Sequence, residues 1–191
     1  EVFFIQNRIG KGKTIFGLIK FVTMKKNSPS LGTGSITIKD DPRVLPLGKY
    51  LRKAKINELP QLFNILYGHM SVVGPRPLTK DTFEAYDIKS QDIISKVTPG
   101  LSGLGSIVFR DEESILSKGV DSVKLYKDII APYKANLEIW FVNNQSLKLY
   151  FSLIIATIWV VFRPDSKIIT KWKVFNDAPK PGYGLKKYIK N

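Results

Sequence analysis

A carboxylate and an arginine stand in two neighbouring stretches of the sequence that suit a metal ion and a phosphate. Glu58 opens a short helical pattern in the run Lys-Ile-Asn-Glu-Leu-Pro-Gln-Leu, where Pro60 fits the first turn because proline lacks an N–H that a helix start leaves unused. Arg76 stands between two prolines, which restrict its backbone and hold its guanidinium ready for bidentate phosphate binding. Together they predict a metal and phosphate site. A structural arginine that caps carbonyl groups is the alternative for Arg76.

The elements around these residues form a short amphipathic helix, a turn at Gly68 and a β-branched strand. Apolar residues recur in the helix at helical spacing, and we expect them to face a core. They are Leu59, Leu62, Phe63 and Leu66.

The first part of the chain predicts a β-hairpin. Apolar strands over residues 2–5 and 14–24 flank a basic turn over residues 6–13 that contains two glycines. Lys20 lies near the end of the second strand and is a candidate contact for a substrate or a carboxylate. A solvent-exposed strand lysine is the alternative interpretation, since charged side chains are usually exposed.

A loop and a short helix connect the hairpin to Glu58. Residues 25–39 are rich in Ser, Gly and Asn, which predicts a mobile loop, either a lid or a surface excursion. The pair Asp40 and Asp41 favours a turn over a metal site. Residues 44–53 predict a short helix that ends at Arg52 and Lys53, with Arg52 either neutralising phosphate charge or forming a surface salt bridge.

The second half of the chain predicts helices around one glycine-rich loop. Residues 79–95 read as one amphipathic helix, and residues 114–142 as helical with a break at Pro132. Residues 97–106 contain Pro-Gly-Leu-Ser-Gly, whose glycines allow backbone N–H groups to approach a phosphate or simply mark a turn.

The C-terminal part combines an apolar run with a basic tail. Residues 149–162 are the most apolar stretch but are too short to cross a bilayer, which needs about 20 residues. This stretch is either a core helix or a helix in the plane of a membrane surface, and we expect a combination of both. Residues 164–191 form a basic tail with interleaved aromatic side chains, which suits an anionic lipid surface, single-stranded nucleic acid or simple solvation.

The composition limits the class of function. A length of 191 residues suggests one domain, and the fold class that follows is α+β, helix-rich, with a small β-hairpin and amphipathic helices at a membrane surface. The net charge of +14 points to an anionic partner: nucleic acid, a membrane or phosphate-bearing substrates. No nucleic-acid-binding motif supports the first of these. Zero cysteines and one histidine exclude thiol catalysis and a histidine-rich metal site.

The two stretches around Glu58 and Arg76 resemble the signature of the bacterial sugar transferases, the monotopic phosphoglycosyl transferases. That signature reads Asp-Glu-Leu-Pro-Gln-Leu and then Gly-Pro-Arg-Pro. Further elements resemble the family in the same order over about residues 1 to 110 and make the resemblance specific. They are Gln-Asn-Arg-Ile-Gly at 6–10, Lys-Phe-Val-Thr-Met at 20–24, Asp-Pro-Arg at 41–43, Gly-Lys-Tyr-Leu-Arg-Lys at 48–53 and Pro-Gly-Leu-Ser-Gly at 99–103.

The resemblance implies a reaction and its partners. The family transfers a sugar phosphate from a nucleotide-activated sugar, such as a UDP-sugar, to a polyprenyl phosphate, undecaprenyl phosphate in bacteria. It does so with Mg²⁺ and initiates the assembly of polysaccharides or glycans. It implies a monotopic protein at the cytoplasmic face of the inner membrane. A hydrophobic anchoring segment of the family would lie upstream of Glu1, so we expect the domain of residues 1–191 to lack that segment.

The resemblance also assigns roles to particular residues. Asn57 and Glu58 hold the catalytic positions, with Glu58 also associated with the metal, and the catalytic set includes Lys20 and Arg52. Cations neutralise the phosphates so that a carboxylate of the family can attack. The residues expected to bind substrate phosphates are Arg76, Arg8, Gly100, Ser102 and Gly103.

The sequence departs from the family at two positions. Asn57 stands where the family has its nucleophilic aspartate, and Val22 stands where the family usually has arginine. An amide is a poor nucleophile, which leaves three interpretations: Glu58 has taken over as nucleophile, the residue has been changed to trap an inactive state, or the chain is a non-catalytic relative.

Two alternative functions follow from these features. A non-catalytic relative with the same fold would bind a nucleotide sugar or a partner enzyme, and Asn57 favours this alternative. A basic nucleic-acid-binding module rests on the net charge alone.

Overall fold

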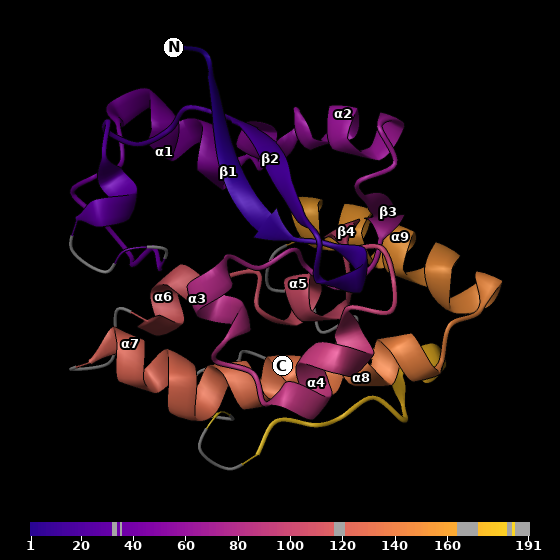
Figure 1. Ribbon diagram of the computed structural model, residues 1–191. Coiled ribbons are helices and arrows are strands. Elements are labelled where there is room, and N and C mark those ends of the chain that lie inside the picture. The colour runs from indigo at the N-terminus through magenta and orange to yellow at the C-terminus, as the bar shows by residue number, and fades with distance from the viewer. Residues whose placement is uncertain (32–33, 35, 117–120, 164–171, 183–184, 186–191) are drawn as a thin grey trace.

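The chain has a helix-rich α+β fold, as the sequence predicts, but with two small sheets where the sequence predicts one hairpin. The computed structural model describes residues 1–31, 34, 36–116, 121–163, 172–182 and 185. Figure 1 shows α1, α2 and the first residues of the chain on one side of the molecule, and α4, α7 and α8 on the opposite side. Strands β3 and β4 and helix α5 lie between these two sides.

The predicted hairpin is confirmed, with a longer first strand than expected. β1 (Phe3–Ile9) pairs antiparallel with β2 (Ile15–Phe21), and η1 (Lys11–Lys13) forms the turn. The prediction that the turn begins at residue 6 is wrong, because residues 6–9 continue the ladder. Only a short turn is needed, since Gly12 and Lys13 adopt positive φ angles of 64° and 62° that reverse the chain tightly.

A second, parallel sheet replaces the loop predicted for residues 97–106. β3 (Ser71–Val73) pairs with β4 (Gly100–Ser102), and α5 (Leu104–Val108) follows directly. Glycines allow this pairing. A Cβ at Gly100 would lie 2.0 Å from the backbone nitrogen of Gly74, and one at Gly103 would lie 2.2 Å from the carbonyl oxygen of Gly74. Close backbone approach is therefore one role of these glycines.

The helix after Glu58 is packed in the opposite sense to the predicted one. α1 (Pro46–Lys53) leads through η3 (Ile56–Glu58) to α2 (Gln61–Leu66). The expectation of a buried apolar face is wrong, because between 48% and 79% of each of the four apolar side chains Leu59, Leu62, Phe63 and Leu66 is exposed.

Polar side chains hold α2 in place instead. Gln61 and Asn64 are each only 1% exposed. The Asn64 side chain donates to the carbonyl of Gly17 at 2.8 Å and accepts from the N–H of Ile19 at 3.0 Å. α2 therefore attaches to β2 through hydrogen bonds to its backbone, and a small core of Phe16, Leu18 and Met70 lies nearby.

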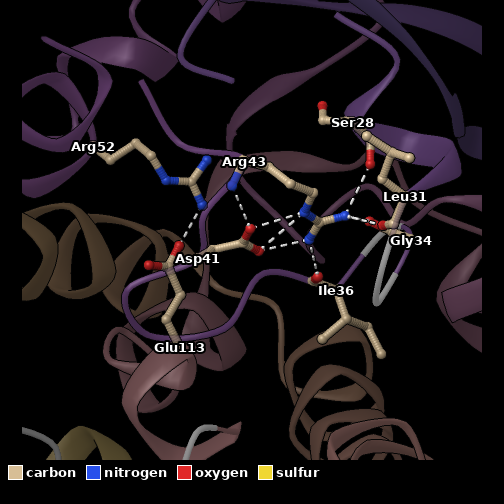
Figure 2. A network of polar contacts seen from close by, with 8 residues as sticks. All are labelled: Ser28, Leu31, Gly34, Ile36, Asp41, Arg43, Arg52 and Glu113. Atoms are coloured by element: carbon tan, nitrogen blue, oxygen red, sulfur yellow. Dashed lines mark hydrogen bonds and ion pairs between the residues drawn. The ribbon is translucent and has the colours of Figure 1, made fainter. Parts of the chain in front are cut away.

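The described part of the loop over residues 25–39 is organised around a buried arginine (Figure 2). Arg43 forms an ion pair with Asp41 at 2.6 Å and donates to the carbonyls of Ser28, Leu31, Gly34 and Ile36. The loop contains the short η2 (Ser28–Ser30). Arg43 ties these described residues into a fixed arrangement, which argues against the predicted mobile lid at these positions.

The helix predicted over residues 79–95 is two helices. α3 (Lys80–Phe83) and α4 (Ile88–Ile94) are separated by a turn at Glu84 and Ala85 and a bend at Tyr86. Asp87 caps α4 by accepting from the N–H of Ser90, which starts a new helix in a new direction.

The largest core gathers around α8. α6 (Glu112–Leu116), α7 (Ser122–Leu125) and the π-helical turn η4 (Tyr126–Ile130) lead into α8 (Ala131–Asn143). The predicted break at Pro132 is wrong. Proline here occupies the first turn of α8, directly after the π-helical turn, where no N–H is required of it.

The helix α9 (Leu147–Phe162) has one buried face and one exposed apolar face. Leu149, Leu153, Ala156 and Val160 are buried, whereas large apolar side chains elsewhere on the helix are exposed, among them Phe151, Ile155, Ile158 and Phe162. No described helix is both long enough and apolar enough to cross a bilayer.

The basic tail over residues 164–191 lies largely outside the described residues. Its described part contains η5 (Lys173–Phe175) and packs Phe175 and Leu185 into the main core. The hydroxyl of Tyr133 donates to the carbonyl of Pro179 at 2.9 Å, so this part of the tail is attached to α8.

The glycine contact between the parallel strands generates a stability prediction. We expect Gly100→Ala to lower the free energy of unfolding by at least about 2 kcal/mol, because the added Cβ overlaps the backbone of Gly74. Gly182→Ala is the matched control, since a Cβ there meets nothing within 4 Å. Urea unfolding measures both, and equal values for the two variants would contradict the packing argument.

Candidate active site

The candidate site lies where the hairpin, η3 and the segment after β3 meet. β1 contributes Arg8, β2 contributes Lys20, η3 contributes Asn57 and Glu58, and Arg76 follows β3. The structure therefore brings together residues that are up to 68 positions apart in the chain. These side chains are electrostatically coupled, because the charges of Arg76 and Lys20 both lower the pKa of Glu58.

Glu58 and Arg76 form the ion pair at the centre of the site. Nη2 of Arg76 lies 2.8 Å from Oε1 of Glu58, and Nη1 lies 3.4 Å from Oε2. The pair is bidentate, and its side chains are 15% exposed for Glu58 and 30% for Arg76. Burial alone would raise the pKa of Glu58. The charges of Arg76 and Lys20 outweigh burial and hold the pKa well below the usual range of a glutamate, so Glu58 is an anion at neutral pH.

Like charges crowd around this single carboxylate. We call Arg8, Lys20, Lys55 and Arg76 the cationic cluster. Burial, followed by the charge of Arg8, lowers the pKa of Lys20 well below its usual range. Burial and the charge of Arg76 lower the pKa of Arg8 to about 10. The cationic cluster therefore carries unfavourable repulsion that an additional anion would relieve.

Arg8 and Lys20 differ in how their side chains are held. Arg8 donates to the carbonyl of Pro77 at 3.0 Å and to Oε1 of Gln6 at 2.6 Å, and its Nε is buried without a hydrogen-bond partner among the described residues. The backbone of Lys20 pairs with Phe4 in the hairpin, whereas its side-chain nitrogen makes no hydrogen bond or salt bridge within the part of the chain that the structure describes. The Lys20 ammonium is thus available to an incoming oxygen anion.

Asn57 is buried at the edge of the same site. Its side chain is 6% exposed, and Oδ1 has no hydrogen-bond partner among the described residues. Lys55, two residues earlier, adopts a positive φ of 59°, which turns the chain sharply before Asn57. A buried amide oxygen without a partner is costly, and a ligand or water that donates to it would remove that cost.

Arg52 is paired with a residue of α6. It forms a salt bridge with Glu113, as Figure 2 shows. Its charge nevertheless contributes to the lowered pKa of Lys20, so it lies within electrostatic reach of the site. The salt bridge that the sequence offered as the alternative is present, and a role in neutralising phosphate stays a prediction.

The residues of the glycine-rich segment lie beside the site with their polar groups engaged. The N–H of Gly100 donates to the carbonyl of Pro75 at 2.8 Å, and the hydroxyl of Ser102 pairs with that of Thr157 at 2.6 Å. Gly103 packs against Gly74. Phosphate binding by these three residues stays a prediction, and in this arrangement their described contacts support the backbone that carries Arg76.

Three functional candidates were missed by sequence reasoning. Lys55 precedes the motif in the sequence. Only the structure reveals its left-handed backbone and the lowering of the Glu58 pKa by its charge. Glu113 was part of an acidic run, and its pairing with Arg52 crosses 61 residues. Glu138 lies in a predicted helix at a position that looks exposed, yet it is 3% exposed.

The metal that the family resemblance implies can be tested against these side chains. No group of three or more His, Cys, Asp or Glu side chains that could hold a metal ion occurs among the described residues. Glu58 and the unpartnered Oδ1 of Asn57 offer oxygen ligands. Mg²⁺ is commonly bound by one or two carboxylates plus substrate phosphates and water, so the residues fit an ion that binds together with a phosphate substrate.

Comparisons with known proteins find a matching family and several similar sequences. Residues 1–164 match the family described as "Bacterial sugar transferase". The chain is 30% identical over 168 residues to the galactosyl transferase CpsE of Streptococcus agalactiae, covering 83% of this chain and 34% of the relative. It is 30% identical over 172 residues to the undecaprenyl-phosphate galactose phosphotransferase of Salmonella typhimurium, covering 83% and 33%.

A third relative is more similar over a shorter stretch. It is the UDP-N-acetylgalactosamine-undecaprenyl-phosphate N-acetylgalactosaminephosphotransferase of Aeromonas hydrophila, which is 40% identical over 109 residues. This match covers 56% of the chain and 26% of the relative. The chain therefore spans about a third of the length of these relatives or less.

The central ion pair generates a second stability prediction. We expect Glu58→Gln to lower the free energy of unfolding at pH 7 by about 2 kcal/mol, because Arg76 loses its anionic partner while it stays largely buried. Glu84→Gln is the matched control. Its exposed pair with Lys80 at 3.9 Å contributes less than about 0.5 kcal/mol. Chemical denaturation measures both variants.

The pH dependence follows from the lowered pKa of Glu58. A carboxylate whose pKa is depressed in the folded state stabilises that state above its unfolded pKa, and this stability is lost as pH falls toward the folded value. The difference between wild type and Glu58→Gln should thus persist at pH 5 and shrink only in stronger acid. A difference that vanishes between pH 7 and pH 5 would contradict the assignment.

Proposed function

Because this chain belongs to the bacterial sugar transferase family, we propose that it transfers a sugar phosphate from a UDP-sugar to a polyprenyl phosphate and so initiates polysaccharide assembly. The observation that carries this proposal is the cationic cluster around Glu58, beside the unpartnered oxygen of Asn57. Two of the relatives are named for undecaprenyl phosphate, and one of these is also named for a UDP-sugar. Both substrates bring phosphate groups that the cluster can bind.

The cationic cluster supplies the main requirement of this reaction. A phosphate acceptor and a diphosphate donor repel each other, and positive charges in a partly buried site reduce that repulsion where the reacting atoms meet. Arg76 is suited to a planar, bidentate contact, and Lys20 to a single oxygen. Glu58 keeps the cluster together when no substrate is bound, since its carboxylate compensates Arg76 and Lys20.

Because Asn57 stands at the family's nucleophile position, the reaction needs another nucleophile. An amide oxygen does not attack phosphorus effectively, and both oxygens of Glu58 accept hydrogen bonds from Arg76. The acceptor phosphate itself is then the best nucleophile. Its oxygen attacks the β-phosphorus of the UDP-sugar, the bond from that phosphorus to the bridging oxygen breaks, and UMP leaves. The sugar remains attached to the transferred phosphorus.

Magnesium belongs to the same proposal. Glu58 and Oδ1 of Asn57 would hold the ion together with the donor's phosphates, and a bound Mg²⁺ supplies additional charge neutralisation there. Because the cationic cluster surrounds Glu58, the free protein should bind Mg²⁺ weakly and the nucleotide-bound protein should bind it more tightly.

A membrane surface is the proposed location, at the cytoplasmic face of the bacterial inner membrane. The described part of α1, η3 and α2 exposes Leu47, Tyr50, Leu62 and Leu66, each at least 49%. Basic side chains of α1 lie among them, and the chain as a whole has a net charge of +14. Exposed apolar groups flanked by lysine and arginine suit the interface of an anionic bilayer, where a polyprenyl acceptor resides.

The nucleophile can be identified by intact-mass analysis and kinetics. We expect the wild-type chain, incubated with a UDP-sugar and Mg²⁺, to show no sugar-phosphate adduct and to release UMP only when undecaprenyl phosphate is present. Asn57→Asp should form the adduct and release UMP without the acceptor, because it restores a carboxylate at the family's nucleophile position. Asn144→Asp, at an exposed position, is the matched control and should behave as wild type.

Other outcomes distinguish the alternatives. An adduct on the wild-type chain that disappears in Glu58→Gln means that Glu58 is the nucleophile. Transfer by Asn57→Asp but not by wild type means a site silenced at its nucleophile. Normal UDP-sugar binding without transfer by either protein means a non-catalytic relative, and would overturn the proposed reaction.

Membrane binding can be tested on the exposed face of α2. We expect Leu62→Ser combined with Leu66→Ser to weaken binding to vesicles of phosphatidylglycerol and phosphatidylcholine about tenfold or more, because two large apolar contacts are lost. Ile88→Ser is the matched control. Ile88 is 74% exposed at the start of α4, on the opposite side of the molecule in Figure 1. Vesicle co-sedimentation measures the binding.

Two results would contradict this location. If Ile88→Ser weakened vesicle binding as much as the double substitution in α2, the assignment of membrane binding to α2 would be wrong. Tight, salt-dependent binding to DNA or RNA without binding to anionic vesicles would instead favour the nucleic-acid-binding alternative.

A further inference from the structure

A buried glutamate lies behind the site in the middle of α8. Glu138 is 3% exposed, although acidic side chains are rarely buried without a partner. One of its carboxyl oxygens, Oε2, is buried and has no hydrogen-bond partner among the described residues. A helix in a core does not need a charge at this position, since an apolar residue would pack there at lower cost.

The carboxyl group of Glu138 reaches the segment that carries Arg76. The backbone N–H of Arg76 faces this carboxyl group and favours its ionised form, which lowers the pKa of Glu138 against the effect of burial. On its other side lies α5, where a Cβ added to Gly105 would come within 2.4 Å of Oε1 of Glu138. The absence of a side chain at Gly105 thus makes room for the carboxyl group between α5 and Arg76.

Arg76 is therefore held from two directions. Its guanidinium forms an ion pair with the carboxylate of Glu58, and its backbone N–H faces the carboxyl group of Glu138. The flanking prolines cannot donate backbone hydrogen bonds, so the N–H of Arg76 is the donor within this Pro-Arg-Pro segment. We propose that Glu138 is a positioning residue that, in its ionised form, sets the backbone of Arg76 so that its guanidinium meets the donor's diphosphate.

The charges around Glu138 come from several elements. Lys134 lies one turn earlier on α8, but it is paired with Glu112 of α6 at 3.0 Å. Arg76 acts from its loop, and Tyr86 and Tyr126 line the same buried region. Burial raises the pKa of Glu138 to about 7, against the opposing charges of Lys134 and Arg76. Glu138 thus changes its charge near neutral pH.

Ionisation strengthens the contact with Arg76. A carboxylate accepts a hydrogen bond more strongly than a neutral carboxylic acid does, so Arg76 is held most firmly above pH 7. The stability of the fold changes with pH in the opposite direction to the strength of this contact. Between the usual glutamate pKa and 7 the folded state keeps a proton that the unfolded state has lost, so stability falls as pH rises through that range. Binding of the donor and stability should therefore change with opposite signs.

The experiment measures UDP-sugar binding by calorimetry from pH 5.5 to 8, with thermal unfolding at each pH. The donor's diphosphate remains ionised over this range, so the probe itself does not titrate. We expect the affinity of the wild-type chain to rise about fivefold with pH, as a neutral hydrogen bond becomes a charge-assisted one. Glu138→Gln should bind with a flat profile at the weaker level, and it should melt at or above the wild-type temperature at pH 8.

Controls separate positioning from a purely structural role. Gly105→Ala displaces the carboxyl group without changing Glu138, so it should also flatten the pH profile. Glu84→Gln, at an exposed site on the surface, should keep the wild-type profile. A Glu138→Gln protein that melts lower at pH 8 and keeps the pH profile of wild type would overturn the proposal.

This proposal rests on the proposed function only for its choice of donor. Because the readout is binding, a chain that binds the UDP-sugar with the expected pH dependence but transfers nothing supports the role of Glu138 while it refutes the proposed reaction. If Glu138→Gln does not fold, the pH profiles of UDP-sugar binding by Gly105→Ala and by the wild-type chain test the proposal instead. A flat wild-type profile refutes the role of Glu138.

Discussion

The constraint on which the structure depends is the convergence of several cations on Glu58. Arg76, Lys20 and Lys55 all act on this carboxylate, and Arg8 lies close enough to be affected by Arg76. Repulsion among these side chains would open the site if the surrounding elements did not hold them. The hairpin, η3 and the segment after β3 must therefore be fixed in place by contacts that do not involve the charges themselves. The hydrogen bonds from Asn64 of α2 to β2 and the packing of Gly74 against Gly100 serve this purpose.

The sequence predicts those parts of the site in which local chemistry and position along the chain agree. Proline on both sides of Arg76 and a carboxylate at the start of a helix were sufficient to place Arg76 and Glu58 in one site, but not to show that they form an ion pair. The hairpin and α1 were recognised from their strand and helix patterns. The orientation of α2 was not, because helical spacing identifies an apolar face but not what covers it. Leu62 and Leu66 face outward, whereas the amides of Gln61 and Asn64 are buried.

Contacts across long stretches of chain limited the prediction elsewhere. The glycine-rich segment was recognised, but its pairing with β3 depends on backbone approach to Gly74, which no local pattern reveals. Arg43 follows the turn predicted at Asp40 and Asp41, and no local pattern reveals that it donates to carbonyl groups 7 to 15 residues earlier in the chain. Arg52 was placed near the phosphates, and its partner Glu113 comes from α6. Each of these contacts joins segments that become neighbours only after the chain has folded.

The attachment of α2 through Asn64 has a consequence for how this surface can evolve. Because the helix is fastened by two hydrogen bonds to the backbone of β2, its outward side chains contribute little to folding. Substitutions at these outward positions therefore change the stability of the fold little. Selection acts on them only through the surface or molecule that these side chains contact. This face can diverge rapidly between descendants while the interior that carries the cationic cluster stays unchanged. Asn64 itself should tolerate few replacements, since a shorter or apolar side chain leaves two backbone groups of β2 without partners.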